Sequence, residues 1–534
     1  MPRPGAMLAG AALEGSFRPR SRCITVTAFN RIASGSLATW SRIAVTLISQ
    51  LALVPVYLSY WPSETYGVWL ALQAFYALST IFGMAHLTLM ENEFIRIGNS
   101  DLLALRRTLW SSIPIGLLIA FVQLGIAWAL VKTGVFGRLL IPSTVIEKSL
   151  EADAAWVALA NLACWLIIVA GSSLAVRVLC AVGYYSRYAW MGLPYVILNA
   201  AVPVIVLSRG GSLLAVGLSQ VATTFIFNFL WLMDAIWIAK RHNLAYAMPD
   251  LRLGFQTLYR SIYVLLRLFL EMARQNGFRL VMLPIVGPVR LAEFSTQRTV
   301  GNTAFQCMNS VYAPLLPELM RYVRDRKQGH MEGAFSIIWL LLVLILCPMT
   351  LLVQATMPVI FPWWTRQAFE FDGVLLCYLS ASVLINMVSL PAVAICSGSN
   401  LVVLQLKIAA IAAALLFIGL VPLTHVLGIR GAALSLLICE AGASAVYVRE
   451  CASWLRGRGL DWPSQGFRLC LSAVVLTILA ALLVAVWPQA LPIVLPAYTG
   501  IWAFVGLRLW NATPHEARAY LADRLRGFAP AVRN

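Results

Sequence analysis

Long apolar stretches recur along the chain from about residue 33 to residue 511, separated by short polar or charged segments. Most reach 20 residues or more, and a helix of that length crosses a hydrocarbon layer about 30 Å thick. The pattern therefore predicts an all-α polytopic membrane protein with about fourteen transmembrane helices. They are expected near residues 33–60, 66–90, 111–136, 152–179, 182–207, 212–239, 260–287, 290–322, 333–362, 373–397, 400–424, 426–449, 468–487 and 491–511.

Basic residues gather in alternate loops of this map. Of the 40 Lys and Arg residues, 28 fall in segments of one side together with both termini, seven fall on the other side and five lie within spans. Cytoplasmic loops retain Lys and Arg, so this bias predicts that both termini are cytoplasmic.

Composition excludes two broad classes. The chain is 60% hydrophobic and only 12% charged, whereas a soluble domain carries about 25% charged residues. A soluble enzyme and a disordered chain are both excluded. The net charge of +18 would suggest nucleic acid in a soluble protein, but the loop bias explains it without that partner. A basic inner surface favours anionic lipid head groups instead.

The spans divide into two groups of six on either side of a basic segment. An even number gives both groups the same orientation, so two lobes related by an axis along the membrane normal are expected. The predicted parts are a flexible basic cytoplasmic tail (1–28), an N-lobe (29–240), a cytoplasmic linker (241–259), a C-lobe (260–450), a cytoplasmic loop (451–467), two further spans (468–511) and a second cytoplasmic tail (512–534). The first tail lacks the apolar core of a cleavable signal peptide, so the first span is expected to direct insertion.

Metal, cofactor and catalytic signatures do not emerge from the sequence. The ten Cys residues form no close CxxC pair, and the five His residues show no HExxH spacing. No cofactor or metal is expected. Every loop is short, which leaves no room for an extramembrane catalytic domain, and an enzyme is not expected.

One predicted span is unusually charged. Segment 260–287 contains Arg267, Glu271, Arg274 and Arg279, and each charge near mid-membrane costs about 2.5–3.5 kcal/mol. At 100° per residue the first three fall on one stripe. This stripe must face protein or a water-filled cavity, and Arg298 of the next span adds a further cation.

Two interpretations of the stripe remain open. Glu271 is spaced to pair with Arg267 and Arg274 on the same helix, which would fix helix packing. A single carboxylate does not neutralise several guanidinium groups, however, so a cavity that handles an anion is the preferred hypothesis. Arginine suits phosphate, because its planar fork donates two hydrogen bonds to two oxygens.

Other ionisable residues carry weaker signals. Lys407 and Glu440 are expected as buried single charges, which favours an interhelical ion pair or solvation near a helix end over a coupling site. Glu91 and Glu93 are expected at a solvated helix end. His86, one turn away, is a candidate proton-sensitive group.

Several motifs carry a resemblance to a known family. They are YLSYWPSETYGVW (57–69), AEFSTQRTVGN (292–302), YAPLLPELMRYVRD (312–325) with Pro314, Pro317 and Glu318, FPWWTRQAFEFDGVLL (361–376) and LGIRGAALSLLICE (427–440). In this order they resemble the bacterial polysaccharide flippases, the O-antigen and exopolysaccharide translocases of the multidrug/oligosaccharidyl-lipid/polysaccharide exporter superfamily. The resemblance runs from about residue 33 to residue 450.

This resemblance implies a fold and a function. It implies two six-helix lobes around a central cavity lined by spans one, two, seven and eight, plus two C-terminal helices. The implied substrate is a polyprenyl-pyrophosphate-linked oligosaccharide that moves from the inner to the outer leaflet of the bacterial inner membrane. Implied partners are this lipid-linked oligosaccharide, membrane lipids and polysaccharide polymerase machinery. Arg42, near the inner end of the first span, is the candidate cation of the N-lobe.

Two other functions are weighed against the flippase. A drug or cation exporter of the same superfamily would require acidic, cation-attracting residues in the cavity, where this chain offers arginines. A membrane polysaccharide polymerase or ligase would require an exposed catalytic loop, and the loops are too short for one.

Overall fold

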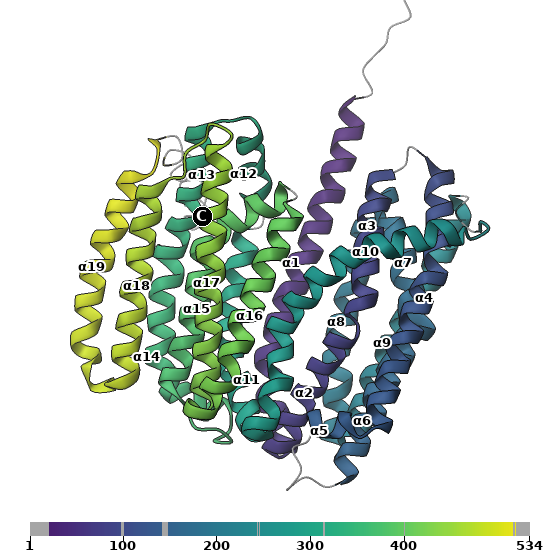
Figure 1. Cartoon of the computed structure of the whole chain (residues 1–534), viewed down its shortest axis with the longest axis horizontal. Helices are drawn as coiled ribbons and strands as arrows, with labels where there is room; N and C mark the ends of the chain where they lie inside the picture. Colours follow the sequence, from purple (N-terminus) through teal and green to yellow (C-terminus); the bar gives the residue numbers. More distant parts are fainter. Residues whose placement is uncertain are drawn as a thin grey trace, which may run out of the picture.

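The computed structural model is built of helices packed side by side (Figure 1). It describes residues 21–97, 101–140, 148–242, 244, 246–312, 315–399, 401–515 and 518, and these ranges contain no strand. The helices are α1 (Ser21–Tyr60), α2 (Ser63–Ser79), α3 (Ile81–Ile97), α4 (Leu102–Lys132), α5 (Val135–Leu140), α6 (Lys148–Cys164), α7 (Ala170–Leu179), α8 (Tyr185–Ser208), α9 (Leu213–Arg241), α10 (Leu251–Met272), α11 (Phe278–Tyr312), α12 (Leu315–Arg324), α13 (Gln328–Leu341), α14 (Cys347–Trp364), α15 (Gly373–Gly398), α16 (Val402–Leu427), α17 (Ile429–Arg456), α18 (Ser464–Val486) and α19 (Leu491–Ala512).

Short irregular turns interrupt several of these helices. Four are π-helical: η1 (Trp165–Val169), η2 (Cys180–Tyr184), η3 (Ala273–Gly277) and η4 (Leu342–Leu346). A 3-10 turn, η5 (Pro488–Ala490), precedes α19. Such π-helical turns often mark functional positions within a helix.

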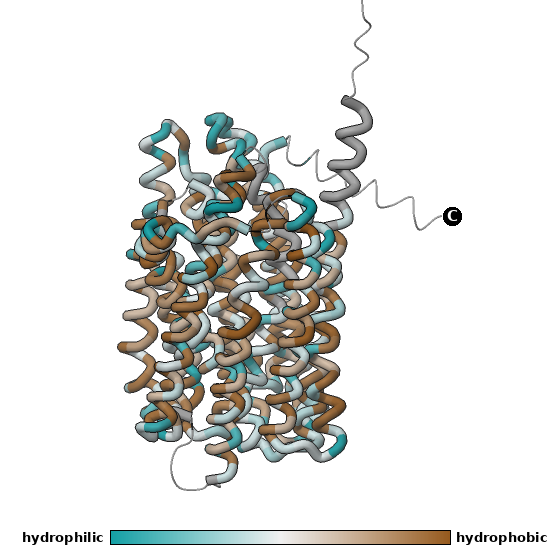
Figure 2. Tube along the Cα trace, turned by 90° about the vertical axis from the view of Figure 1, so that its right-hand side faces the viewer, coloured by the Kyte–Doolittle hydropathy of each residue, from teal (hydrophilic) through white to brown (hydrophobic). Residues whose placement is uncertain are grey.

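The all-α polytopic class predicted from the sequence is confirmed. Eleven helices in the described ranges are long and apolar enough to cross a membrane, or twelve if the bent pair α2 and α3 forms one span. The two other predicted spans, 260–287 and 290–322, coincide with the α10–α11 region, which does not meet this apolar criterion. Figure 2 shows hydrophilic residues gathered at the two ends of the helices and hydrophobic residues between them, as in a multi-pass membrane protein.

The two lobes repeat one order of helix neighbours. In the N-lobe α1 packs on α8, α8 on α9, α9 on α7 and α7 on α4. In the C-lobe α11 packs on α16, α16 on α17, α17 on α15 and α15 on α14. Helices α18 and α19 then pack on the far side of the C-lobe, at the left of Figure 1.

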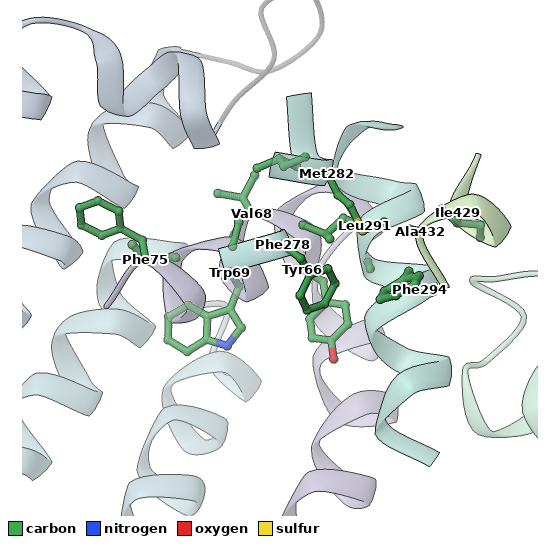
Figure 3. Packing of buried hydrophobic residues seen from close by; sticks show 14 of the residues in the cluster. Tyr66, Val68, Trp69, Phe75, Phe278, Met282, Leu291, Phe294, Ile429 and Ala432 are labelled. Atoms are coloured by element: carbon green, nitrogen blue, oxygen red, sulfur yellow. The ribbon is translucent and has the colours of Figure 1, made fainter. Parts of the chain in front are cut away.

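Helices α2 and α11 join the lobes. Gly67 approaches α11 so closely that an added Cβ would lie 2.2 Å from the carbonyl oxygen of Pro288. Gly287 next to it has φ 79°, a left-handed conformation that breaks α11 and suits glycine. Figure 3 shows the core around this crossing, where Tyr66 and Trp69 of α2 lie near Phe278 and Phe294.

Several predicted boundaries differ from the structure. Helix α10 begins at Leu251, inside the segment expected to be a linker, because Asp250 caps it by accepting a hydrogen bond from the Leu253 amide. Residues 21–28, expected in a flexible tail, belong to α1. Residues 1–20 and most of the second tail lie outside the described residues. Lys407, expected to be buried, is exposed on α16.

Candidate functional site

A polar cavity of about 540 Å³ lies within the C-lobe, where the α10–α11 region faces α15 and α17. Its charged lining residues are Glu271, Arg274, Arg279, Arg298 and Glu440, and its neutral polar residues include Gln275, Asn276, Asn302, Gln306, Ser382 and Asn386. Four of the residues predicted from the sequence therefore line one cavity, although Arg298 lies 19 residues beyond Arg279 in the chain.

Arg274 is held by an acid from another helix. It forms an ion pair with Glu440 of α17, and both side chains are mostly buried, with 18% and 14% of their surfaces exposed. The second carboxylate oxygen of Glu440 accepts a hydrogen bond of 2.9 Å from the Asn386 amide of α15. Of the two interpretations left open for Glu440, an interhelical ion pair and solvation near a helix end, the structure shows the ion pair.

The pairing of Glu271 with Arg267 and Arg274 is wrong. The structure contains no ion pair of Glu271 within the described residues, although Glu271 lines the cavity. The helix changes from α to π geometry at Ala273, so the 100° step that placed Arg274 on the stripe no longer applies there. Arg267 is half-buried on α10 and is not among the residues that line the cavity.

Arg279 and Arg298 have no carboxylate partner among the described residues. The Nε of Arg279 is buried without a hydrogen-bond partner in that part of the chain. Arg298 donates to the carbonyl oxygen of Gln275 at 2.9 Å, and its guanidinium carbon lies 4.5 Å from the centre of the Phe278 ring. These contacts fix the direction of Arg298 without neutralising its charge.

The charges of the cavity do not cancel. Three arginines and two glutamates line it, which leaves a net charge of +1. One arginine is already paired with Glu440, so the excess rests on Arg279 and Arg298. Unpaired cations in a site of low dielectric constant attract an anion more strongly than they do in water.

Two further candidate residues lie away from this cavity. Arg42 is exposed on α1. Its guanidinium group lies beside α8, since a Cβ added to Gly192 of α8 would be 3.7 Å from the Arg42 guanidinium group. His86 is buried in the N-lobe, where its Nε2 lies 3.2 Å from the carbonyl oxygen of Ser112. The structure therefore does not bring either residue to the arginines of the C-lobe.

Glu91 and Glu93 are paired instead of simply solvated. Glu91 accepts from Arg177 at 3.1 Å. Glu93 accepts from Arg96 at 2.6 Å and lies 3.8 Å from Arg260 of α10. These contacts tie α3 to its neighbours at one end of the N-lobe.

Sequence reasoning missed most of the neutral polar lining. Asn386, Asn302 and Gln306 are neutral, so the cost of charge in the membrane, which identified the arginines, did not identify them. Asn386 is the most consequential, because it orients the acid that holds Arg274. A useful signal was a polar amide within an otherwise apolar span, which needs a partner in the membrane.

The described residues offer no cluster for a metal ion. No group of three or more His, Cys, Asp or Glu side chains converges among them. The seven cysteines whose side chains are described are buried and form no disulfide.

Comparisons with known proteins identify the fold. No protein-family model matches the chain, and no curated protein matches it in sequence. The lipid II flippase MurJ in an inward closed conformation has a similar structure, with a TM-score of 0.61 and 12% identity over 91% of this chain and 99% of its own. An inward-facing multidrug resistance MATE transporter of the MOP superfamily has a TM-score of 0.58 and 13% identity, over 79% of this chain and 98% of its own. A variant of the Vibrio cholerae MATE transporter VcmN has a TM-score of 0.51 and 13% identity, over 81% of this chain and 98% of its own. Identities this low show a shared fold only.

Proposed function

We propose that this membrane protein is a flippase that moves an anionic lipid-linked oligosaccharide across the bacterial inner membrane, with both termini cytoplasmic. The substrate is a polyprenyl-pyrophosphate-linked oligosaccharide used in cell-surface polysaccharide assembly. The observation that carries the proposal is the pair Arg279 and Arg298, which line a cavity and have no carboxylate partner among the described residues. The structural likeness to the lipid II flippase MurJ supports a lipid-linked substrate.

The pyrophosphate enters the cavity as the counterion of these arginines. Its charge would be costly to desolvate in the membrane, and guanidinium groups already placed in the site offset that cost. Arg279 and Arg298 form the initial site. Arg274 joins when the phosphate displaces Glu440, which holds Arg274 in the empty cavity. As the partner of Arg274, Glu440 thus takes the place that helical spacing had suggested for Glu271.

A cation exporter is the second candidate. It is favoured by the two acids in the cavity and by the structural likeness to MATE transporters. The net charge of the cavity opposes it, because Glu440 is already occupied by Arg274 and the remaining acid, Glu271, lies among unpaired arginines.

Reconstituted vesicles distinguish these functions. The full-length protein should translocate a fluorescent polyprenyl-pyrophosphate oligosaccharide and should not export a fluorescent organic cation. Arg279→Gln/Arg298→Gln should lower the translocation rate by at least about tenfold, which corresponds to 1.4 kcal/mol. Lys407→Gln is the matched control, because it removes an exposed cation from the same lobe. The proposal would be overturned in favour of a cation exporter if the wild type exported the cation without translocating the lipid, and if cation export persisted in the arginine variant.

A further inference from the structure

A second basic hollow lies outside the arginine cavity. It measures about 450 Å³ and is lined by Met320, Arg321, Val323 and Arg324 of α12, by Gly398 and Ser399 at the end of α15, and by Arg458 after α17. Helix α12 rests directly on the end of α15, since an added Cβ on Gly398 would lie 2.5 Å from the Met320 sulfur. Figure 1 shows α12 at one end of the C-lobe, away from the α2–α11 crossing.

The charge of this hollow is of one sign. Three arginines line it, and none of the described residues that line it is acidic. Asp325 is the nearest acid in sequence and lies 3.3 Å from Arg324, whose side chain is still 77% exposed. The end of α15 contributes about half a negative charge, which the guanidinium groups of Arg324 and Arg458 exceed even with Asp325 beside Arg324.

The hollow also has an apolar wall. Met320 and Val323 belong to its lining, and Val323 is 2% exposed because it packs into the core of the C-lobe. Arg321 and Arg324 lie on the outer face of the same helix and are exposed. Helix α12 is therefore amphipathic, with its apolar face packed on the protein and its basic face exposed.

An aromatic residue fixes the third arginine. The guanidinium carbon of Arg458 lies 3.8 Å from the centre of the Trp454 ring, near the end of α17. Tryptophan is enriched where transmembrane helices leave the hydrocarbon layer, so this contact sets the arginine at head-group level. Stacking leaves the edge of the guanidinium group available to an anion.

We propose that this hollow binds the phosphate head group of an anionic phospholipid from the adjacent leaflet. Arg324 and Arg458 bind the phosphate, while Met320 contacts the first carbons of the acyl chains. Basic pockets between helices at a membrane surface are suited to such head groups. The site is separate from the transport cavity, and its occupation does not depend on the proposed function.

The test uses the full-length protein in a zwitterionic detergent. Phosphatidylglycerol is titrated, and the shift in thermal unfolding temperature gives an apparent affinity. Phosphatidylcholine is the lipid without net charge, and inorganic phosphate at equal concentration tests a free anion. Phosphatidylglycerol should raise the unfolding temperature, and the other two should have little effect.

Two double variants locate the effect. Arg324→Gln/Arg458→Gln should weaken the apparent affinity for phosphatidylglycerol about 25-fold, at about fivefold for each guanidinium group. Arg96→Gln/Arg241→Gln is the matched control, because Arg96 is likewise exposed beside an acid and Arg241 likewise lies over a tryptophan, Trp237. The control should retain the wild-type affinity. Arg324→Lys/Arg458→Lys should stay within about threefold of the wild type, since a point charge still binds phosphate.

Four results would overturn the proposal. The first is a Gln variant that binds phosphatidylglycerol as tightly as the wild type does. The second is an equal loss in the control variant, which would reduce the effect to general surface charge. The third is an equal shift with phosphatidylcholine. The fourth is an equal shift with inorganic phosphate, which would make the ligand a free anion.

Discussion

Arg274 and Glu440 illustrate how this protein accommodates charge within the membrane. Each side chain is mostly buried, and each finds its opposite charge on a different helix. Asn386 satisfies the second oxygen of the carboxylate. Glu271, by contrast, lines the same cavity without an ion pair among the described residues. Removal of the charge of Glu440 should therefore destabilise the protein more than removal of the charge of Glu271.

Substitution of the two acids separates these roles. Glu440→Gln leaves the Arg274 charge mostly buried and without its ion pair, which should lower the free energy of unfolding of the empty protein by about 1–3 kcal/mol. Glu271→Gln removes no ion pair and should change it by less than about 0.5 kcal/mol. Denaturation of both variants in the same detergent, without substrate, measures the difference. Equal losses would show that Glu440 does not hold the empty site.

The sequence predicted this site in part. Arg274, Arg279, Arg298 and Glu271 were identified because charges are costly in apolar spans, and all four line the cavity. The partner of Arg274 was not identified, since its contact with Glu440 of α17 joins residues 166 positions apart. Local periodicity carries no information on such a pairing, and it also failed where the helix becomes π-helical.

Helix α10 is the element that reaches from one lobe to the other. Its first part packs on α3 and α4 of the N-lobe, and its last residues, with η3, reach the cavity of the C-lobe. Asp250 anchors the start of the helix by an ion pair with Arg107 of α4. This hydrogen-bonded guanidinium group, together with the Leu253 amide, holds the pKa of Asp250 below its usual range.

This anchor should depend on pH with a definite sign. A lowered pKa means that the contact stabilises the folded state above the pKa of the unfolded chain, about 3.9, and that the contribution is lost as the pH falls through the folded value. Hydrogen-exchange protection at the start of α10 should therefore persist at pH 5 and fall below about pH 4. Arg107→Gln should move this loss to higher pH. An unchanged profile in that variant would contradict the role of the ion pair.

The crossing of α2 and α11 tolerates no side chain at Gly67. A Cβ there would lie 2.2 Å from a backbone oxygen, so Gly67→Ala must push the helices apart and should cost about 1–3 kcal/mol. Gly125 in α4 is the matched control, since a Cβ there meets nothing within 4 Å. Gly125→Ala should be neutral or stabilising by up to about 1 kcal/mol. Thermal unfolding of both variants decides the matter, and equal stability of the two would contradict the close packing.

Element positions were predicted better than element ends. Twelve of the fourteen predicted segments coincide with helices, or with the bent pair α2 and α3, that are long and apolar enough to cross a membrane, because length and hydropathy identify such spans. The start of α10 within the expected linker was missed, since it depends on packing against the N-lobe as well as on the cap at Asp250. The exposure of Lys407 was missed for the same reason, because a single sequence does not show which face of α16 has neighbours.

The whole molecule consists of two joined lobes and a peripheral pair of helices. A shared core joins the lobes, whereas α18 and α19 pack on the C-lobe beside α13 and α14. The Trp339 ring packs so closely on Gly466 of α18 that a Cβ added to this glycine would lie 3.1 Å from the ring. The indole N–H of Trp502 in α19 donates a hydrogen bond to the carbonyl oxygen of Val343. No residue of this pair lines the arginine cavity.

Removal of the peripheral pair should therefore affect stability before binding. A chain that ends at residue 463 uncovers the core around Trp339 and should unfold at a lower temperature than the full chain. Its affinity for the lipid pyrophosphate should stay within about threefold, measured on the fraction that remains folded. A folded truncation without any substrate binding would show that α18 and α19 contribute to the site.

The most direct test of the central claim compares the binding of polyprenyl pyrophosphate, polyprenyl phosphate and neutral polyprenol to the full-length protein. Because unpaired arginines provide the site, affinity should rise with the number of phosphates, and Arg279→Gln/Arg298→Gln should weaken pyrophosphate binding by at least about tenfold while leaving polyprenol binding unchanged. Equal affinity for the three lipids, or pyrophosphate binding that is unaffected by the double substitution, would contradict an anion-handling cavity.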